Sequence, residues 1–378
     1  MKVGVPKEIK PQESRVGLTP ASVRELTRRG HRVFVEHLAG AGIGVNDAAF
    51  EMAGATILPS AAAVFDAAEL IVKVKEPQPV ERERLRPHHI LFSYLHLAPD
   101  AEQTRELLAS GASCLAYETV THASGHLPLL RPMSQVAGRM AVQAGAHCLE
   151  KMQGGRGLLL GGVPGVEAAR VVVLGAGVVG VNALGIAVGM GADATILDRK
   201  PDVLTSLDER FGNRIKTRVS TPAVVEDLVV EADLVIGAVL LPGARAPKLV
   251  GRDLVTRMRR GAVMVDVAID QGGCFATSRA TTHERPTFLV DGVVHYCVTN
   301  MPAAVADTAT HALNNAVLPA VLELADKGLH RALREDAHLR DGLNLKGGQV
   351  CHPAVAEAQR TTYVPPLQAL GEEVPGRA

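Results

Sequence analysis

Residues 171–198 read VVVLGAGVVGVNALGIAVGMGADATILD, and this stretch decides the fold. It opens with an apolar β-branched run and continues through Gly175, Gly177 and Gly180. It closes with a second apolar run that ends at Asp198. The glycines match the pattern G-x-G-x-x-G, with a helical pattern after them and the acid eighteen residues beyond Gly180. The stretch therefore predicts a strand, a tight turn, a helix and a parallel second strand of a dinucleotide-binding unit.

Each glycine of this turn has a physical reason to be there. Gly175 permits the tight turn, Gly177 lets the backbone approach a pyrophosphate, and Gly180 allows close packing of helix on strand. The helix N-terminus offers free N–H groups to phosphates. Asp198 would accept hydrogen bonds from the adenine ribose and repel a 2′-phosphate, which favours NAD over NADP, although the adjacent Arg199 could accommodate a phosphate. The alternative is a glycine-rich turn in an unrelated α/β sheet.

Residues 171–192 also carry no charge and are long enough to cross a bilayer as a helix. Six of these residues are glycines, and each would cost a helix about 1 kcal/mol. A strand, a turn and a helix instead place the glycines where they are needed. The sequence therefore argues against a membrane span.

The composition places the chain among α/β enzymes. The 378 residues carry 40 Lys and Arg against 40 Asp and Glu, and 47% of them are hydrophobic. A formal charge of zero without a long basic run argues against a nucleic-acid or anionic-membrane partner. The length predicts two to three domains.

Cysteine and histidine usage argues against disulfides and metals. The five cysteines are scattered and form no Cys-x-x-Cys pair, and the fourteen histidines include no metal-ligand spacing. The N-terminal residues form no apolar segment of a secretory signal. We expect reduced thiols, no metal and a cytoplasmic location.

Strands and helices are predicted to alternate on both sides of the central stretch, which indicates mostly parallel sheets covered by helices. Expected strands are residues 2–5, 32–36, 70–74, 90–94, 113–117, 171–174, 194–197, 234–239 and 263–267. The first expected helix has Thr19 as its N-cap, Pro20 as its first residue and Gly30 as its C-terminal cap. Further helices are expected at residues 60–68, 80–86, 99–110, 133–152 and 305–325. No Pro-rich linker is present, so we expect helices to join the domains and the domains to share a cleft.

Three polar residues of the first half are candidates for chemistry. Lys75 and His96 each follow the end of an expected strand, where α/β sheets place their ligands, and Arg15 lies near the first strand. Taken singly, each has an ordinary alternative, as a solvated surface charge or a structural histidine. Together with a nicotinamide site and no metal, these three residues fit a single type of reaction well.

The chain resembles the alanine dehydrogenase/pyridine nucleotide transhydrogenase family over essentially its whole length. The matching segments are GVPKE at 4–8 with Arg15, KVKEP at 73–77, YLH at 94–96, PMSQVAGR at 132–139, LGGVPG at 160–165, residues 175–180, DVAIDQG at 266–272, HYCV at 295–298 and NMP at 300–302. Two small departures are residues 305–307, where the family has a Pro-Arg pattern, and Cys351, where Thr is usual.

The resemblance implies the fold class, the activity and the assembly. The fold would be α/β with two Rossmann-like doubly wound domains. A cofactor domain at residues 129–305 would be inserted into a discontinuous substrate domain at residues 1–128 plus 306–378. The activity would be NAD-dependent oxidative deamination of L-alanine to pyruvate and ammonia, and the reverse amination. Members of the family are commonly homohexamers.

The resemblance also implies the roles of individual residues. Arg15 would bind the substrate carboxylate, Lys75 would bind and polarise the developing carbonyl oxygen, and His96 would be the acid/base. Apart from the resemblance, two cations beside an iminium need a counter-charge, for which Asp270 is the candidate. Tyr94 is a candidate for lining the substrate or nicotinamide pocket. Further pocket residues would be Met133, Ser134 and Asn300, and further cofactor contacts Val178, Val179, Ser220, Val239, Leu240, Val267, Ile269 and Met301.

Three other functions remain open from the sequence. The soluble subunit of a proton-translocating transhydrogenase shares the two-domain plan but has no amino-acid substrate. A lysine- or saccharopine-type dehydrogenase would need further polar residues for a long side chain. An NAD-sensing module without catalysis would have lost Arg15, Lys75 or His96, and the chain has all three.

Overall fold

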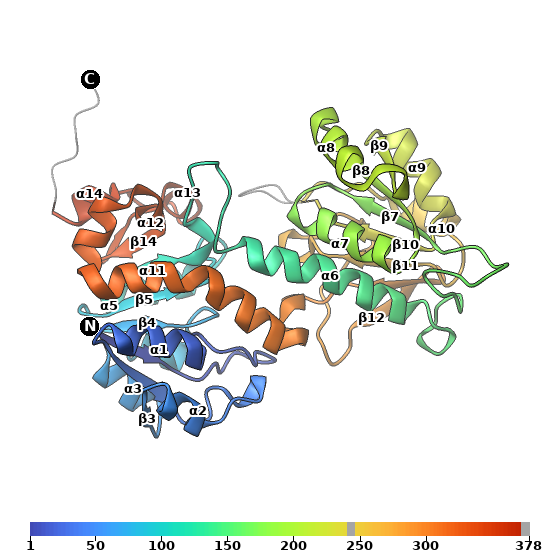
Figure 1. The fold of residues 1–378 in the computed structure, drawn as a ribbon. Coiled ribbons are helices and arrows are strands. Elements are labelled where there is room, and N and C mark those ends of the chain that lie inside the picture. Colours follow the sequence, from blue (N-terminus) through green and yellow to red (C-terminus); the bar gives the residue numbers. More distant parts are fainter. Residues whose placement is uncertain (240–245, 372–378) are drawn as a thin grey trace. The chain divides into compact units, whose positions relative to one another are not determined.

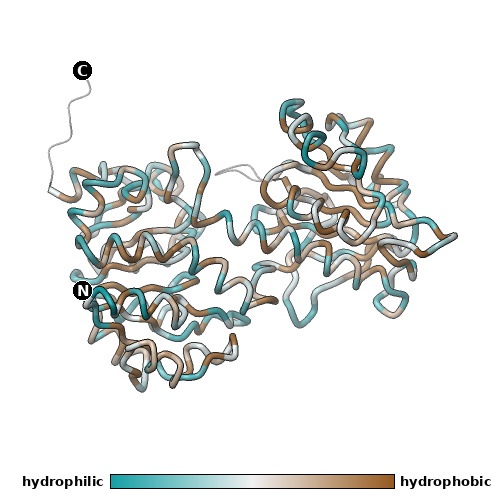
Figure 2. Tube along the Cα trace, viewed as in Figure 1, coloured by the Kyte–Doolittle hydropathy of each residue, from teal (hydrophilic) through white to brown (hydrophobic). Residues whose placement is uncertain are grey.

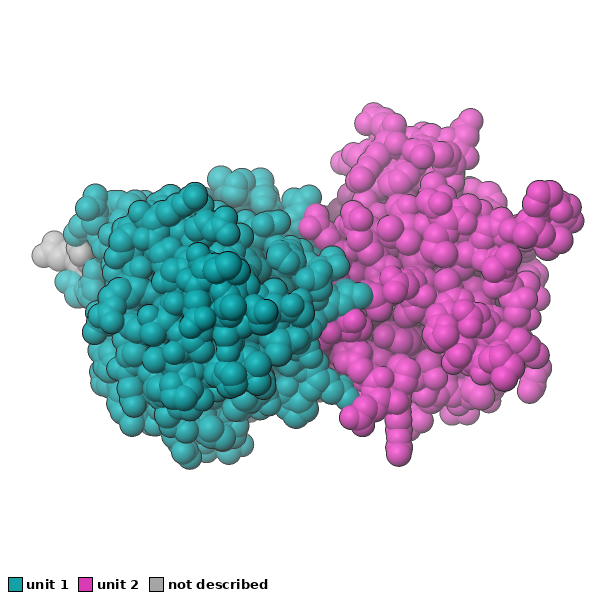
Figure 3. Space-filling view, turned by 60° about the horizontal axis from the view of Figure 1, so that its bottom comes forward, with its two compact units in different colours: residues 1–133, 305–378 teal, residues 134–304 magenta. Residues whose placement is uncertain are grey.

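The computed structural model describes residues 1–239 and 246–371. The chain forms two compact units (Figure 3). Unit 1 contains Met1–Met133 and Val305–Ala378, and unit 2 contains Ser134–Ala304. The first boundary lies five residues after the expected one at residue 128, within a helix, and the second lies one residue before the expected one.

Unit 1 is an eight-stranded sheet in the order β15-β14-β6-β5-β4-β1-β2-β3, with helices packed against it (Figure 1). Six of its strands are parallel, and a hairpin from the end of the chain extends the sheet, with β14 antiparallel to β6 and β15 antiparallel to β14. The strands are β1 (Lys2–Val5), β2 (Arg32–Glu36), β3 (Thr56–Leu58), β4 (Leu70–Val72), β5 (Ile90–Ser93), β6 (Ser113–Ala116), β14 (Leu343–Lys346) and β15 (Gln349–Val350).

The helices of unit 1 follow local sequence signals. In α1 the Thr19 side chain accepts a hydrogen bond from the Ser22 N–H, Pro20 is the first helical residue, and Gly30 leaves the helix with φ +82°. The others are α2 (Asp47–Met52), α3 (Ala61–Ala67), α4 (Pro79–Arg82), α5 (Ala101–Ser110), η1 (Ala41–Ile43), η2 (Tyr117–Thr119), α11 (Ala306–Glu335), α12 (Ala337–Arg340), α13 (Pro353–Ala358) and α14 (Pro366–Ala369), with α1 at Pro20–Arg28.

Unit 2 is a seven-stranded sheet in the order β12-β13-β11-β10-β7-β8-β9, in which only β12 is antiparallel. The strands are β7 (Arg170–Leu174), β8 (Asp193–Asp198), β9 (Lys216–Val219), β10 (Leu234–Gly237), β11 (Val263–Asp266), β12 (Thr287–Val290) and β13 (Val293–Tyr296). The helices are α6 (Arg131–Cys148), α7 (Val178–Gly189), α8 (Pro201–Phe211), α9 (Pro222–Glu231) and α10 (Arg252–Arg257), with short turns η3 (Lys151–Gln153), η4 (Gly212–Arg214), η5 (Ile269–Gln271) and η6 (Met301–Val305). The strand order reverses at β7, between β10 and β8, which is where α/β sheets bind ligands.

Both sheets have apolar strands buried on two faces, as a parallel sheet covered by helices requires. Figure 2 shows the hydrophobic residues gathered along the strands of each unit. Every residue of β4, β5, β6, β10, β11 and β13 is buried. The expected fold class, two doubly wound α/β domains with one inserted into the other, is confirmed.

Some element boundaries differ from the sequence prediction. The last large helix, expected at residues 305–325, runs to Glu335, with a kink at Gly328, whose φ of +73° and ψ of +163° are not helical. The helix expected at residues 133–152 is α6, which ends at Cys148. Strands β3, β9, β12, β13, β14 and β15 were not predicted. Among the described residues, no helix is both long and apolar enough to span a membrane.

Candidate active site

Lys75 lies just beyond the carboxyl end of β4 and is half-buried. Two bonds join the chain around it to the neighbouring strand β5. The Tyr94 N–H donates to the Val74 carbonyl at 3.2 Å, and the Ser93 hydroxyl donates to the Lys75 carbonyl at 3.3 Å. The two strand ends that carry Lys75 and His96 are therefore held side by side.

His96 follows β5 in a constrained backbone conformation. Its φ is +51°, a left-handed value that is uncommon outside glycine and tends to occur at functional positions. The Glu118 carboxylate stabilises this turn by accepting from the N–H groups of Leu95, at 3.2 Å, and His96, at 2.6 Å. The His96 side chain is 48% exposed, and its Nδ1 lies 3.8 Å from Glu118 Oε1. The ring nitrogen nearer to Glu118 is thus Nδ1.

Tyr94 connects His96 with the arginine of the site. Its ring stacks on the His96 ring with the centroids 5.9 Å apart and an angle of 4° between the planes. The phenol is buried and donates to the Leu129 carbonyl at 2.6 Å. Burial raises the pKa of Tyr94, and the nearby charge of Arg15 opposes that shift. Tyr94 is therefore a neutral hydrogen-bond donor rather than a proton acceptor.

Arg15 is 2% exposed, and one edge of its guanidinium is already occupied by a carboxylate. Nε donates to Glu13 Oε1 at 2.7 Å and Nη2 donates to Glu13 Oε2 at 2.5 Å. Nη1 contacts the Met133 sulfur at 2.9 Å. A substrate carboxylate bound bidentately, as the sequence predicts, would use the edge formed by Nη1 and Nη2.

Unit 1 thus brings together most of the residues expected to bind substrate. Arg15 touches Met133, Tyr94 stacks on His96, and Lys75 follows the adjacent strand. Glu13 and Glu118, which orient Arg15 and His96, were missed from the sequence. Glu118 follows a buried strand, as Lys75 and His96 do, so the same signal could have found it.

The glycine turn of unit 2 has the geometry that its sequence indicates. Gly175 has φ +101°, and a Cβ at Gly180 would lie 1.8 Å from the Gly175 carbonyl oxygen, so both positions need glycine. A Cβ at Gly177 would meet nothing within 4 Å. Gly177 caps α7 without a side-chain hydrogen bond, and the first residue of the helix, Val178, is 37% exposed. The N-terminal N–H groups of a twelve-residue helix therefore face open space.

Asp198 ends β8 beside this turn. Its carboxylate accepts from the N–H groups of Ala176 and Lys200, both at 2.9 Å, and its carbonyl accepts from the Ser220 N–H at 2.9 Å. Each carboxylate oxygen retains a lone pair for a ribose hydroxyl. Arg199, next in the chain, is exposed.

Other expected cofactor contacts lie on the neighbouring strand ends of unit 2. Val239 follows β10, and its Cγ2 lies 3.1 Å from where a Cβ of Gly175 would be. Val267 donates to the Gly237 carbonyl at 3.0 Å. Ile269 is buried, Val179, Ser134 and Ser220 are half-buried, and Leu240 lies outside the described residues.

Asp270 is exposed on η5, and a buried carboxylate shapes the loop that carries it. Asp266 accepts from the N–H groups of Ala268 and Cys274 at 3.1 and 2.9 Å, and from the Ser278 hydroxyl at 2.5 Å. Burial raises the pKa of Asp266, and these hydrogen bonds oppose the shift. The sequence motif included Asp266, but its role as the anchor of this loop was not predicted.

Asn300 and Met301 follow β13 and begin the segment through which the chain returns to unit 1. Asn300 has φ +55°, and its carbonyl lies 3.3 Å from His283 Nε2. Met301 is 3% exposed and begins η6. Within residues 1–239 and 246–371, no three His, Cys, Asp or Glu side chains are grouped so that they could hold a metal ion.

These features fit a dinucleotide. N–H groups of the α7 N-terminus, which has no side-chain cap, can bind phosphates. Gly177 leaves space next to the backbone for a pyrophosphate, and Asp198 lies where such folds hydrogen-bond the ribose. Unit 1 adds a lysine and a histidine that follow strand ends, together with Arg15. The fold and these residues define a two-domain α/β dehydrogenase.

Comparison with known proteins gives the family. The model of the alanine dehydrogenase/PNT N-terminal domain matches residues 4–137, and that of the C-terminal domain matches residues 141–353. The chain belongs to the alanine dehydrogenase/PNT family, as the sequence motifs indicate. It is 57% identical over 371 residues to the alanine dehydrogenase of Halomonas elongata, covering 98% of this chain and 100% of the relative.

Two solved structures extend the comparison. An L-alanine dehydrogenase matches with a TM-score of 0.92 at 52% identity, over 95% of this chain and 99% of that one. A transhydrogenase from Sinorhizobium meliloti matches with a TM-score of 0.82 at 26% identity, over 93% of this chain and 100% of that one. The relation is thus far stronger to alanine dehydrogenases than to this transhydrogenase.

Proposed function

We propose that the chain catalyses the oxidative deamination of L-alanine by NAD, and the reverse reductive amination of pyruvate. The observation that carries this proposal is the full-length relation, above 50% identity, to alanine dehydrogenases. The cluster of Arg15, Tyr94 and His96 in unit 1 supports it, because it offers the groups that bind a carboxylate and move a proton.

The reaction consumes L-alanine, NAD⁺ and water and yields pyruvate, ammonium, NADH and a proton. Bound NAD supplies the acceptor for the hydride of the substrate Cα. Residues 175–180, Asp198 and Ser220 would hold the cofactor, with Val239, Ile269 and Met301 lining its site. Further cofactor contacts are proposed for Ser134, Arg199, Val267, Asp270 and Asn300.

The protein groups bind the substrate and move protons. Arg15 binds the carboxylate through the edge that Glu13 leaves, and this orients the Cα hydrogen. Lys75 binds the oxygen that becomes the pyruvate carbonyl. His96 accepts and returns protons at Nε2 as water adds to the iminium carbon and ammonia leaves. Asp270 would balance the positive charge of the iminium.

NAD is proposed over NADP because Asp198 would repel a 2′-phosphate. We also propose a homohexamer in the cytoplasm, as the family resemblance implies. Binding of NADPH as tight as that of NADH would contradict the first proposal. A mass in solution other than six times that of the chain would contradict the second.

The test is the absorbance of NADH at 340 nm with purified full-length chain. We expect NADH to form from L-alanine and NAD, and to disappear with pyruvate and ammonium. Arg15→Ala should mainly weaken the binding of alanine and pyruvate. A transhydrogenase subunit instead would show no turnover of either amino acid or keto acid. An NAD-sensing module would bind NADH, again without turnover.

A further inference from the structure

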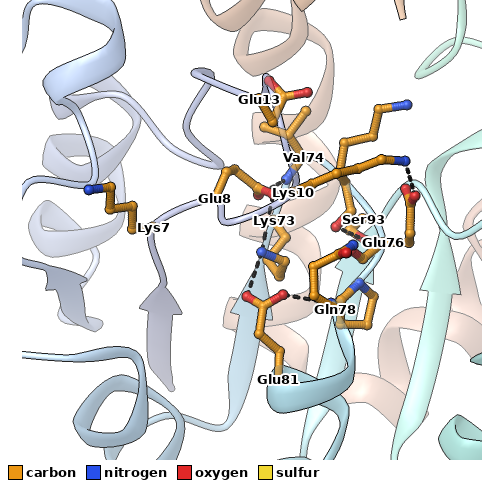
Figure 4. A network of polar contacts seen from close by, with 12 residues as sticks. Lys7, Glu8, Lys10, Glu13, Lys73, Val74, Glu76, Gln78, Glu81 and Ser93 are labelled. Atoms are coloured by element: carbon orange, nitrogen blue, oxygen red, sulfur yellow. Dashed lines mark hydrogen bonds and ion pairs between the residues drawn. The ribbon is translucent and has the colours of Figure 1, made fainter. Parts of the chain in front are cut away.

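Three charged side chains are buried together beside the segment that carries Lys75, and none has a role in the chemistry above. Lys73 is 0% exposed, and its Nζ donates to Glu8 Oε2 at 3.1 Å and to Glu81 Oε1 at 2.8 Å. The Glu8 and Glu81 side chains are each 1% exposed. We refer to Glu8, Lys73 and Glu81 as the buried triad (Figure 4).

The second oxygen of each carboxylate holds the chain that carries Lys75. Glu8 Oε1 accepts from the Val74 N–H at 2.7 Å, and Glu81 Oε2 accepts from the Gln78 N–H at 2.7 Å. Val74 directly precedes Lys75, and Gln78 lies three residues after it. The segment 74–78 is therefore fixed at both ends by carboxylates that share one ammonium group (Figure 4).

Burying three charges costs free energy, and the cost is offset only when every group is paired in good geometry. Burial alone would lower the pKa of Lys73, but the two carboxylates outweigh it and hold the pKa above its ordinary value. Lys73 is thus an ammonium in the folded protein. A well-packed apolar core could replace such a triad at no cost in stability. What the triad provides beyond stability is placement of the segment, because each carboxylate also holds one of its backbone N–H groups.

We propose that Lys73 is a positioning residue that places Lys75 for substrate binding, by locking the Glu8 and Glu81 carboxylates onto the two ends of segment 74–78. This inference rests on the proposed function, in which Lys75 binds the substrate oxygen. A charged side chain displaced by about 1 Å can lower a rate about 100-fold.

A second ion pair of this region provides a matched control. Lys10 pairs with Glu76, inside the same segment, but the Lys10 side chain is 33% exposed. The Glu76 side chain is 16% exposed, so this pair is partly buried, whereas the triad is fully buried. A pair that water reaches contributes less than a fully buried one. Lys10→Met should therefore lower kcat/KM for pyruvate much less than replacement of the triad does.

The test variant is the triple replacement Lys73→Met, Glu8→Gln and Glu81→Gln. It leaves no buried charge, and each glutamine oxygen can still accept from its backbone N–H, while the ammonium link is lost. The two buried amide NH2 groups have no acceptor beside Met, so we expect the unfolding temperature to fall, and the kinetics are measured below it on protein shown to be folded by circular dichroism. We expect kcat/KM for pyruvate to fall by about 10- to 100-fold, with the Kd of NADH unchanged. Wild-type kinetics for pyruvate in the folded triple variant would overturn the proposal.

Hydrogen exchange of the wild-type chain gives a second test that no folding defect can affect. The amides of Val74 and Gln78 should exchange far more slowly than exposed loop amides, and their rapid exchange would overturn the proposal. The two hypotheses fail differently. If the wild type does not turn over pyruvate, the proposed function is wrong. If the wild type is active and the triple variant equals it, only the positioning role is wrong.

Discussion

A methyl group at Gly177 would test the dinucleotide site without disturbing the fold. The backbone there has φ −72° and ψ −170°, which any residue adopts, and a Cβ would meet no atom within 4 Å. Gly177→Ala should therefore fold normally, at a cost of about 1 kcal/mol or less for a poorer helix cap. The new methyl group would occupy the space in which the pyrophosphate approaches the α7 N-terminus.

The loss of binding follows from the hydrogen bonds that the methyl group would block. A hydrogen bond to a charged group is worth about 1.5–3 kcal/mol, so one blocked phosphate contact should raise the Kd of NADH by about 10- to 150-fold. The assay is titration of NADH fluorescence, with thermal unfolding alongside. Gly180→Ala is the comparison, because its Cβ would lie 1.8 Å from the Gly175 oxygen and the turn must deform. It should lose stability as well as binding. Wild-type affinity for NADH in Gly177→Ala would refute the site.

Three further predictions concern catalysis, thiols and pH. His96→Ala should lower kcat by about 100- to 10,000-fold with the Kd of NADH unchanged, and normal turnover would remove His96 from the chemistry. Burial raises the pKa of Cys114 to about 12, so Ellman's reagent should label this thiol only after unfolding; fast labelling of native protein would contradict its burial. Hydrogen bonds from Lys327 and Arg331 lower the pKa of Glu335 to about 2. These bonds therefore stabilise the fold fully above the ordinary pKa near 4.5. Their contribution is lost as the pH falls from 4.5 through 2. Glu335→Gln should therefore lower the unfolding temperature at pH 7 and less so at pH 3.5, and an equal difference at both would argue against these pairs.

The sequence was sufficient for the local features that depend on neighbouring residues. The glycine turn, the Asp198 position and the α1 caps are local signals, and the structure has each of them. The strands β1 and β2 match their expected bounds because buried β-branched runs between turn residues have few alternatives. The activity could be predicted more closely than the bounds and pairing of the strands, because the family motifs are also local in the sequence.

Long-range features could not be predicted from the sequence. Strands β14 and β15 add to the edge of the sheet of unit 1 from over 200 residues away, next to β6. Helix α11 continues past Gly328, a residue that usually ends helices. Glu118 follows an expected strand and Lys73 lies within one, but their partners are distant in the sequence, so only the fold shows them.

The central claim is that the Arg15 side chain, Lys75 and His96 bind one small keto acid. A crystal structure of the chain with NADH and pyruvate tests it most directly. The account predicts the pyruvate carboxylate at the Nη1 and Nη2 atoms of Arg15, and its carbonyl oxygen within hydrogen-bond distance of Lys75 and His96. Pyruvate bound elsewhere, with these three side chains unchanged from the structure described above, would contradict it.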